Sequence, residues 1–138
     1  MFRLWIATVT LALALGVAPA LAGKGGNHSS STTAGIALNE SDPHYGDTVS
    51  FAVTYPSVRW DPLVRVLCYQ NGALVYQYSQ APNGSTPWVP SFRLWDASWA
   101  ANGGGSASCV ADLYYYTWKG QTETSVVYLA HTDFTAAG

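Results

Sequence analysis

Residues 63–78 read LVRVLCYQNGALVYQY, and this stretch decides the fold. Val64, Val66 and Cys68 alternate with other side chains, which is the period of two that a strand with one buried face shows. Asn71-Gly72 follows directly, and this pair favours a two-residue hairpin because both residues accept a positive φ. The stretch therefore predicts two antiparallel strands, at residues 63–70 and 73–78, joined by a tight turn.

The same alternation recurs along most of the chain. In residues 106–116 it places Ala107, Cys109 and Tyr115 on the inward face, and it predicts that Tyr114 and Tyr116 are exposed. Seven or eight short strands with frequent turns predict an all-β antiparallel sandwich or barrel. The expected strands lie at residues 36–39, 46–55, 63–70, 73–78, 91–95, 106–116 and 122–134.

Composition narrows the classes of protein to which the chain can belong. The chain has 138 residues, of which 49% are hydrophobic and 10% charged, with a formal net charge of −2. These values are typical of one globular domain and argue against intrinsic disorder. Six basic residues provide no basic stripe, so the sequence does not predict a dedicated nucleic-acid binder.

The N-terminus has the pattern of a secretory signal peptide over residues 1–22. Arg3 supplies the positive start, Ile6–Ala18 is an apolar run, and Ala20-Leu21-Ala22 has the small residues of a cleavage site. The alternative is an uncleaved membrane anchor at residues 5–22, close to the shortest length that spans a bilayer. We expect cleavage, an extracellular product without membrane insertion, a flexible Gly/Ser/Thr-rich tether at residues 23–34, and one folded domain at residues 35–138.

Cys68 and Cys109 are the two cysteines of the chain. Export to an oxidising compartment predicts a disulfide between them. Metal binding and a reactive thiol are the alternatives. Neither is favoured, because the cysteines lack a CxxC spacing and both fall on the inward faces of expected strands.

Three short segments resemble immunoglobulin-like domains. Gly46–Phe51 resembles strand B of that superfamily, Val66–Gly72 resembles strand C and its turn, and Ala107–Ala111 resembles strand F. Residues 35–135 as a whole resemble small secreted bacterial immunoglobulin-like proteins of uncharacterised function, on a Cys-Tyr-Gln-x-Gly segment at 68–72, a Phe-x-Leu strand at 92–94, and Trp99. The resemblance implies an immunoglobulin-like sandwich and leaves function open.

The chain also departs from the antibody pattern. Antibody domains bridge strands B and F across the sandwich, but the segment that resembles strand B carries no cysteine. The resemblance therefore implies that Cys68 and Cys109 join strands C and F, which are neighbours in one sheet. Ala107 stands where the tyrosine corner would be, and Trp99 is expected to plug the core.

The sequence offers little for catalysis or for a metal ion. Gly104–Ser108 lacks the second glycine of a nucleophile elbow, and His28, His44 and His131 are scattered. We therefore expect no enzyme, no catalytic residue, no cofactor and no metal. Carboxylates near the first turn leave Ca²⁺ binding open beside ordinary turn chemistry. They are Glu40, Asp42 and Asp47.

The excess of aromatic residues needs an explanation. Aromatic side chains suit strands and pair across them, but exposed rings can also bind a partner or stack on sugars. The candidate binding surface consists of Tyr69, Trp88, Tyr114, Tyr116 and Trp118. The first hypothesis is a secreted non-enzymatic module for adhesion or recognition, and the alternative is a carbohydrate-binding module. The partner, protein or glycan, is unknown. A monomer and an assembly through an edge strand both remain open.

Overall fold

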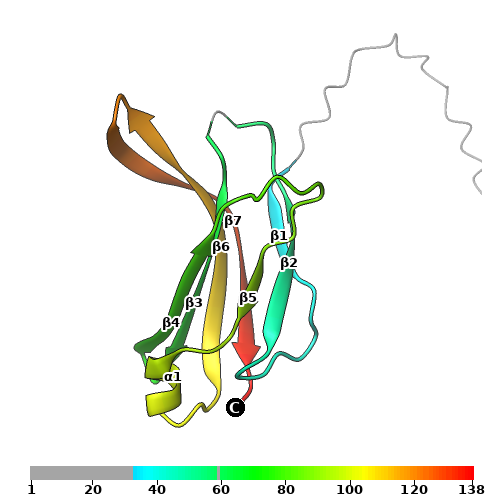
Figure 1. The fold of residues 1–138 in the computed structure, drawn as a ribbon, viewed down its shortest axis with the longest axis vertical. Helices are drawn as coiled ribbons and strands as arrows, with labels where there is room; N and C mark the ends of the chain where they lie inside the picture. Colours follow the sequence, from blue (N-terminus) through cyan, green and yellow to red (C-terminus); the bar gives the residue numbers. More distant parts are fainter. Residues whose placement is uncertain (1–32, 59) are drawn as a thin grey trace, which may run out of the picture.

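The computed structural model describes residues 33–58 and 60–138. These residues form seven strands and one short helix (Figure 1). The elements are β1 (Gly35–Leu38), β2 (Thr48–Thr54), β3 (Leu63–Gln70), β4 (Ala73–Gln80), β5 (Ser91–Arg93), α1 (Ala97–Ala101), β6 (Ala107–Lys119) and β7 (Thr122–Ala136). The signal peptide expected at residues 1–22, nearly all of the tether and His28 lie outside the described residues.

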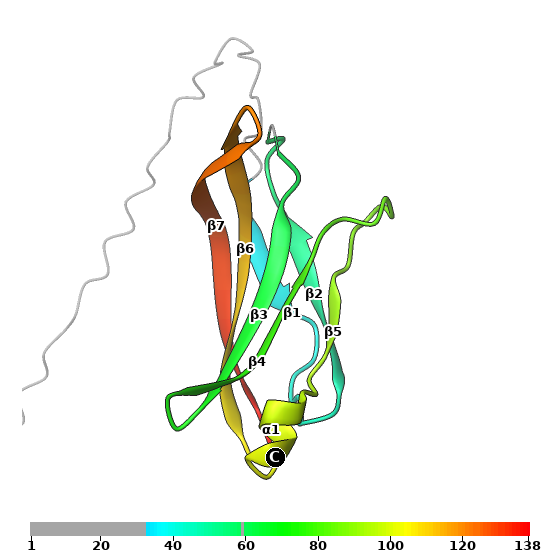
Figure 2. The same cartoon turned by 60° about the vertical axis from the view of Figure 1, so that its left-hand side comes forward.

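The strands form two antiparallel sheets that face each other (Figures 1 and 2). The smaller sheet has the order β1-β2-β5, and the larger has the order β4-β3-β6-β7. The predicted all-β sandwich of seven or eight strands is therefore confirmed, with seven strands among the described residues. The strand arrangement is compatible with an immunoglobulin-like domain. Four strands are edges, because β1 and β5 end the smaller sheet and β4 and β7 end the larger one.

The core follows the alternation of the sequence. Val49 and Phe51 of β2 and Val64 and Val66 of β3 are fully buried between the sheets. The rings of Phe51 and Phe92 meet edge to face at 5.9 Å and 71° between their planes. Burial of such apolar surface is the main stabilising contribution to a sandwich of this size.

The hairpin between β3 and β4 has the predicted turn. Asn71 has a φ of 49° and Gly72 a φ of 80°, so both central residues lie in the left-handed region that a twist-matched two-residue turn requires. The turn thus sets which residues of β4 face the core.

Cys68 and Cys109 form the predicted disulfide. They are paired directly across β3 and β6, and their Cα atoms are 4.1 Å apart. The bond therefore links neighbouring strands of one sheet and does not join the two sheets. A disulfide of this kind indicates a non-reducing environment.

A five-residue helix, α1, was not predicted by the sequence. It begins because Asp96 caps it, with an Asp96 carboxylate oxygen accepting from the backbone N–H of Ser98 at 2.7 Å. The helix presses Trp99 into the core, where the ring is fully buried and its Nε1 donates to the carbonyl of Gly105 at 2.8 Å. The expectation that Trp99 plugs the core is confirmed. In the part of the chain that the structure describes, no helix has the length and apolar character needed to cross a bilayer.

The disulfide should contribute substantially to stability. It closes a loop with a sequence separation of 41 residues, for which chain entropy predicts about 3–4 kcal/mol. The double variant Cys68→Ala/Cys109→Ala should therefore lower the free energy of unfolding in urea by about 3–4 kcal/mol. Reduction of the unaltered chain should give a similar loss, and a loss below about 1 kcal/mol in both cases would contradict this view.

Two tryptophans four residues apart provide a matched test of the core. Trp99→Ala should lower the free energy of unfolding by about 3–5 kcal/mol, because it leaves a large cavity. Trp95→Ala, at a ring that is 53% exposed, should change it by about 0.5 kcal/mol or less. Thermal or urea unfolding measures both, and equal losses would refute the placement of Trp99.

Candidate binding surface

One face of the larger sheet points away from the core and carries most of the predicted site. The strand register pairs Arg65 with Asp112 and Leu63 with Tyr114, and none of these four residues has the inward parity of Cys68 and Cys109. Continuing in steps of two along β6, Tyr116 and Trp118 lie on the same outer face. The prediction that the side chains of Tyr114 and Tyr116 point away from the core is thus confirmed.

The rings on this face form a chain, which we call the aromatic ladder: Tyr128, Tyr114, Tyr116 and Trp118. Tyr128 lies across the sheet from Tyr114, with ring centroids 6.0 Å apart. Tyr114 and Tyr116 meet edge to face at 5.4 Å and 87°, and Tyr116 meets Trp118 at 6.4 Å and 67°. Such edge-to-face pairs fix each ring by its neighbours.

Arg65 holds one end of the ladder in place. Its Nη2 donates to the Asp112 carboxylate at 2.8 Å and to the Tyr128 hydroxyl at 3.1 Å. Its Cζ lies 5.3 Å from the centroid of the Tyr114 ring and 5.8 Å from that of Tyr128, within the range of cation–π attraction. Partial burial disfavours the guanidinium charge, but these hydrogen bonds outweigh it, and the pKa of Arg65 lies above its ordinary value.

The predicted exposure of Tyr114 was wrong. The side chain points outward as expected, but it is only 2% exposed because Arg65, Tyr116 and Tyr128 cover it. Tyr116 is partly exposed, while Trp118 and Tyr128 are 41% and 58% exposed. Tyr114 is therefore the base of the ladder, and the accessible rings are those of Tyr116, Trp118 and Tyr128.

The ladder lies on a hairpin that extends beyond the rest of the sandwich. The pairing of β3 with β6 ends at Tyr114, whereas β6 and β7 continue to pair as far as Lys119 and Thr122 (Figure 1). The register shifts after Leu113 and again after Thr117, and such bulges increase the local twist of a ribbon. Tyr116 and Trp118 therefore stand on a projecting two-stranded arm, and Tyr128 lies at the base of this arm, opposite Tyr114.

The other two predicted site residues lie elsewhere. Tyr69 is exposed on the same outer face, but it pairs with Ser108, six residues before Tyr114 along β6. At the rise per residue of a β-strand, six residues correspond to a separation of about 20 Å. Tyr69 is therefore not part of the ladder.

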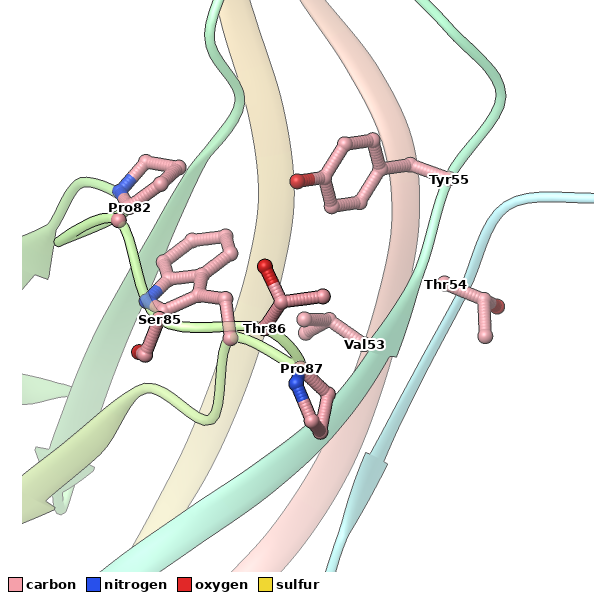
Figure 3. A pocket seen from close by; sticks show the side chains of 9 residues that line it. Val53, Thr54, Tyr55, Pro82, Ser85, Thr86 and Pro87 are labelled. Atoms are coloured by element: carbon pink, nitrogen blue, oxygen red, sulfur yellow. The ribbon is translucent and has the colours of Figure 1, made fainter.

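Trp88 is buried beside the smaller sheet. Its ring packs against Tyr55 edge to face at 6.5 Å. The two residues help to line a hollow of about 380 Å³ between the end of β2 and the loop that follows β4. Figure 3 shows the hydroxyls of Tyr55 and Thr86 turned toward the middle of this hollow. Trp88 thus contributes to a separate, largely uncharged depression.

Two of the three acidic residues near the first turn accept hydrogen bonds from backbone N–H groups. The Glu40 carboxylate accepts from the N–H of Ser50 at 2.8 Å and from its hydroxyl at 2.9 Å. Asp47 accepts from the N–H of His44 at 2.9 Å. Among residues 33–58 and 60–138, no three His, Cys, Asp or Glu side chains gather as a metal-ligand set. The turn interpretation accounts for these two carboxylates.

Arg65 and Tyr128 were missed by the sequence reasoning. Alternation assigned Arg65 to the outward face, but a lone outward arginine does not by itself indicate a partner. Tyr128 joins the ladder only through the register of β7 against β6, which depends on the two bulges. Neither bulge is signalled by a glycine or proline within β6 or β7.

The contacts of Arg65 should stabilise the domain as well as order the ladder. Arg65→Gln should lower the free energy of unfolding by about 1–2 kcal/mol, because it leaves the largely buried Asp112 carboxylate without its cation. Arg93→Gln is the matched control, since the Arg93 side chain is exposed and has no hydrogen bond or ion pair among the described residues. Equal effects of the two changes in urea unfolding would contradict the role of Arg65.

The chain is thus a disulfide-bonded β-sandwich with three accessible rings, Tyr116, Trp118 and Tyr128, on the β6–β7 hairpin. Comparison with protein-family models, with curated proteins and with solved structures gives no match.

Proposed function

We propose that this chain is a secreted, non-enzymatic recognition or adhesion module that binds a protein partner through the aromatic ladder. The observation that carries the proposal is the set of accessible rings of Tyr116, Trp118 and Tyr128, ordered on the projecting β6–β7 hairpin. Tyrosine, tryptophan and arginine are the residues most enriched among the anchors of protein interfaces. All three residue types occur within this ladder and its Arg65 support.

The order of the ladder supports its role as a preformed surface. Binding is weakened by the entropy lost when rotamer-rich side chains are immobilised. Here the Arg65 guanidinium and the buried Tyr114 ring already fix the tyrosines around them. The ladder therefore presents a large amphipathic area with little further ordering required.

The relative orientation of the rings favours a protein over a sugar at this place. A sugar-stacking platform presents ring faces in a common plane, whereas Tyr114, Tyr116 and Trp118 meet at 87° and 67°. Successive rings turned edge to face instead provide ridges and notches into which side chains of a partner fit.

The secreted location is supported by two separate features. The first 22 residues have the pattern of a signal peptide, and the domain contains a disulfide that is stable outside reducing compartments. A recognition module in this setting acts at or beyond the cell surface.

Carbohydrate binding is the second candidate function. The observation in its favour is a cleft between β4 and β5 that is lined by the exposed rings of Tyr78 and Trp95, away from the ladder. The two functions are compatible in one domain, because they use different faces.

Binding to intact cells tests the ladder. The purified, labelled domain should bind saturably to cells of the producing organism, and prior protease treatment of those cells should abolish the binding. Trp118→Ala should weaken the apparent affinity about tenfold or more, as loss of an aromatic anchor does. Tyr69→Ala replaces an exposed ring outside both the ladder and the β4–β5 cleft, and this variant should bind normally.

Two results would contradict the proposal. One is binding that persists unchanged in Trp118→Ala and Tyr128→Ala. The other is binding that survives protease but is lost when periodate oxidises the surface glycans, because the partner would then be a carbohydrate.

A further inference from the structure

Residues of β4 and β5, which end the two sheets, line a cleft. Figure 2 shows the course of these two edge strands. At one end, the side-chain amide of Gln80 bridges the edges: it donates to the carbonyl of Ser91 and accepts from the Ser91 N–H at 3.1 Å. At the other end lies Asp96, the residue that caps α1. The hollow between them measures about 300 Å³, at the lower end of the range for small-molecule sites.

Two exposed aromatic rings line this cleft. Tyr78 is 58% exposed and has its ring edge-to-face with the buried Phe92 at 6.4 Å, which fixes its orientation. Trp95 is 53% exposed and has no ring contact among the described residues. Exposed apolar surface gathered around a hollow is typical of a ligand-binding groove.

Three side chains of the cleft have polar atoms that no protein group in the described part of the chain binds. Tyr76 lies at its base with a nearly buried ring, yet its hydroxyl has no hydrogen-bond partner among the described residues. The Arg93 guanidinium likewise has no partner there. One oxygen of Asp96 accepts from Ser98, and the other has no partner within residues 33–58 and 60–138.

Burial and nearby groups keep the Tyr76 hydroxyl protonated. Burial chiefly, with the proximity of Tyr78 and Asp96, raises the pKa of Tyr76 to about 12. The hydroxyl is therefore a hydrogen-bond donor throughout the physiological pH range. The cleft thus offers donors at Tyr76 and Arg93 and an acceptor at Asp96.

The hollow does not end at Asp96. A second depression of about 200 Å³ continues along β4 toward Leu74 and shares Tyr76, Gln77 and Asp96 with the first. Two adjoining depressions with common walls form one elongated groove. Its shape suits a ligand of more than one ring.

We propose that this groove binds a glycan, with one sugar ring in the cleft between Tyr78 and Trp95. The apolar face of a sugar ring packs on aromatic faces, while its neighbouring hydroxyls each donate and accept hydrogen bonds. Arg93 and Asp96 form a donor and acceptor pair for two such hydroxyls, and Tyr76 donates to a third from below. The site is separate from the aromatic ladder, so it does not depend on the protein-binding proposal.

An extended peptide added to the free edge of β4 is the competing occupant. It would bond to the backbone of β4 and would require neither the Arg93 guanidinium nor the Tyr76 hydroxyl. These side chains are the polar groups that the cleft leaves without partners, and they favour a ligand rich in hydroxyls.

A glycan array followed by titration of the best-bound oligosaccharide tests the site. The unaltered domain should bind at least one glycan, and Tyr76→Phe, which removes one oxygen atom, should weaken that binding several-fold. Trp95→Ala should weaken it about tenfold or more. Trp118→Ala is the matched control in the ladder and should leave glycan binding unchanged, which separates this proposal from the protein-binding one.

Three results would overturn the glycan proposal. The first is no binding by the unaltered, correctly folded domain to any glycan on the array. The second is glycan binding that is lost in Trp118→Ala but retained in Trp95→Ala, which would move the sugar to the ladder. The third is binding of unbranched peptides that is lost when a proline replaces Gln77 on β4 but is unaffected by Tyr76→Phe.

Discussion

The bond between Cys68 and Cys109 fixes the register of the two central strands of the larger sheet. Because side chains alternate from face to face, a slip of one residue between β3 and β6 would turn every outward group inward. The disulfide makes such a slip impossible once it has formed. The same register places Arg65 opposite Asp112 and ends the pairing at Tyr114, so the position of the ladder follows from a covalent bond buried on the other side of the sheet.

Local signals in the sequence were enough to predict the strands, the hairpin between β3 and β4, and the disulfide. Alternation identified the inward residues of β2 and β3, and Asn71-Gly72 located the hairpin because few residue pairs accept two positive φ angles. The disulfide was predicted from the expected export to an oxidising compartment and from there being two cysteines in the chain. The prediction that Tyr114 is exposed failed because it depended on tertiary contacts. Alternation predicted the direction of the Tyr114 side chain, but it could not predict that Arg65 and Tyr128 cover it. The candidate site also divided among three places, because Trp88 lies beside the smaller sheet and Tyr69 pairs with β6 six residues away from Tyr114.

The two proposed surfaces differ in what holds their side chains in place before a partner binds. The ladder is held by contacts among its own members, so its rings are fixed before any partner arrives. The cleft between β4 and β5 has a fixed base in Phe92. Within residues 33–58 and 60–138, no protein group binds the Tyr76 hydroxyl, the Arg93 guanidinium or the second oxygen of Asp96. The first arrangement suits broad contact with a macromolecule, and the second suits a ligand that supplies missing hydrogen bonds.

The amide of Gln80 imitates a peptide group when it bonds to both backbone atoms of Ser91. This clamp joins the stems of the connection between β4 and β5, and the five residues at its tip, 83–87, are exposed. Such a segment tolerates changes in length and sequence because the strands on either side are already tied together. The sandwich therefore carries a built-in attachment point, at which evolution or an engineer can exchange one loop for another while the framework keeps its shape.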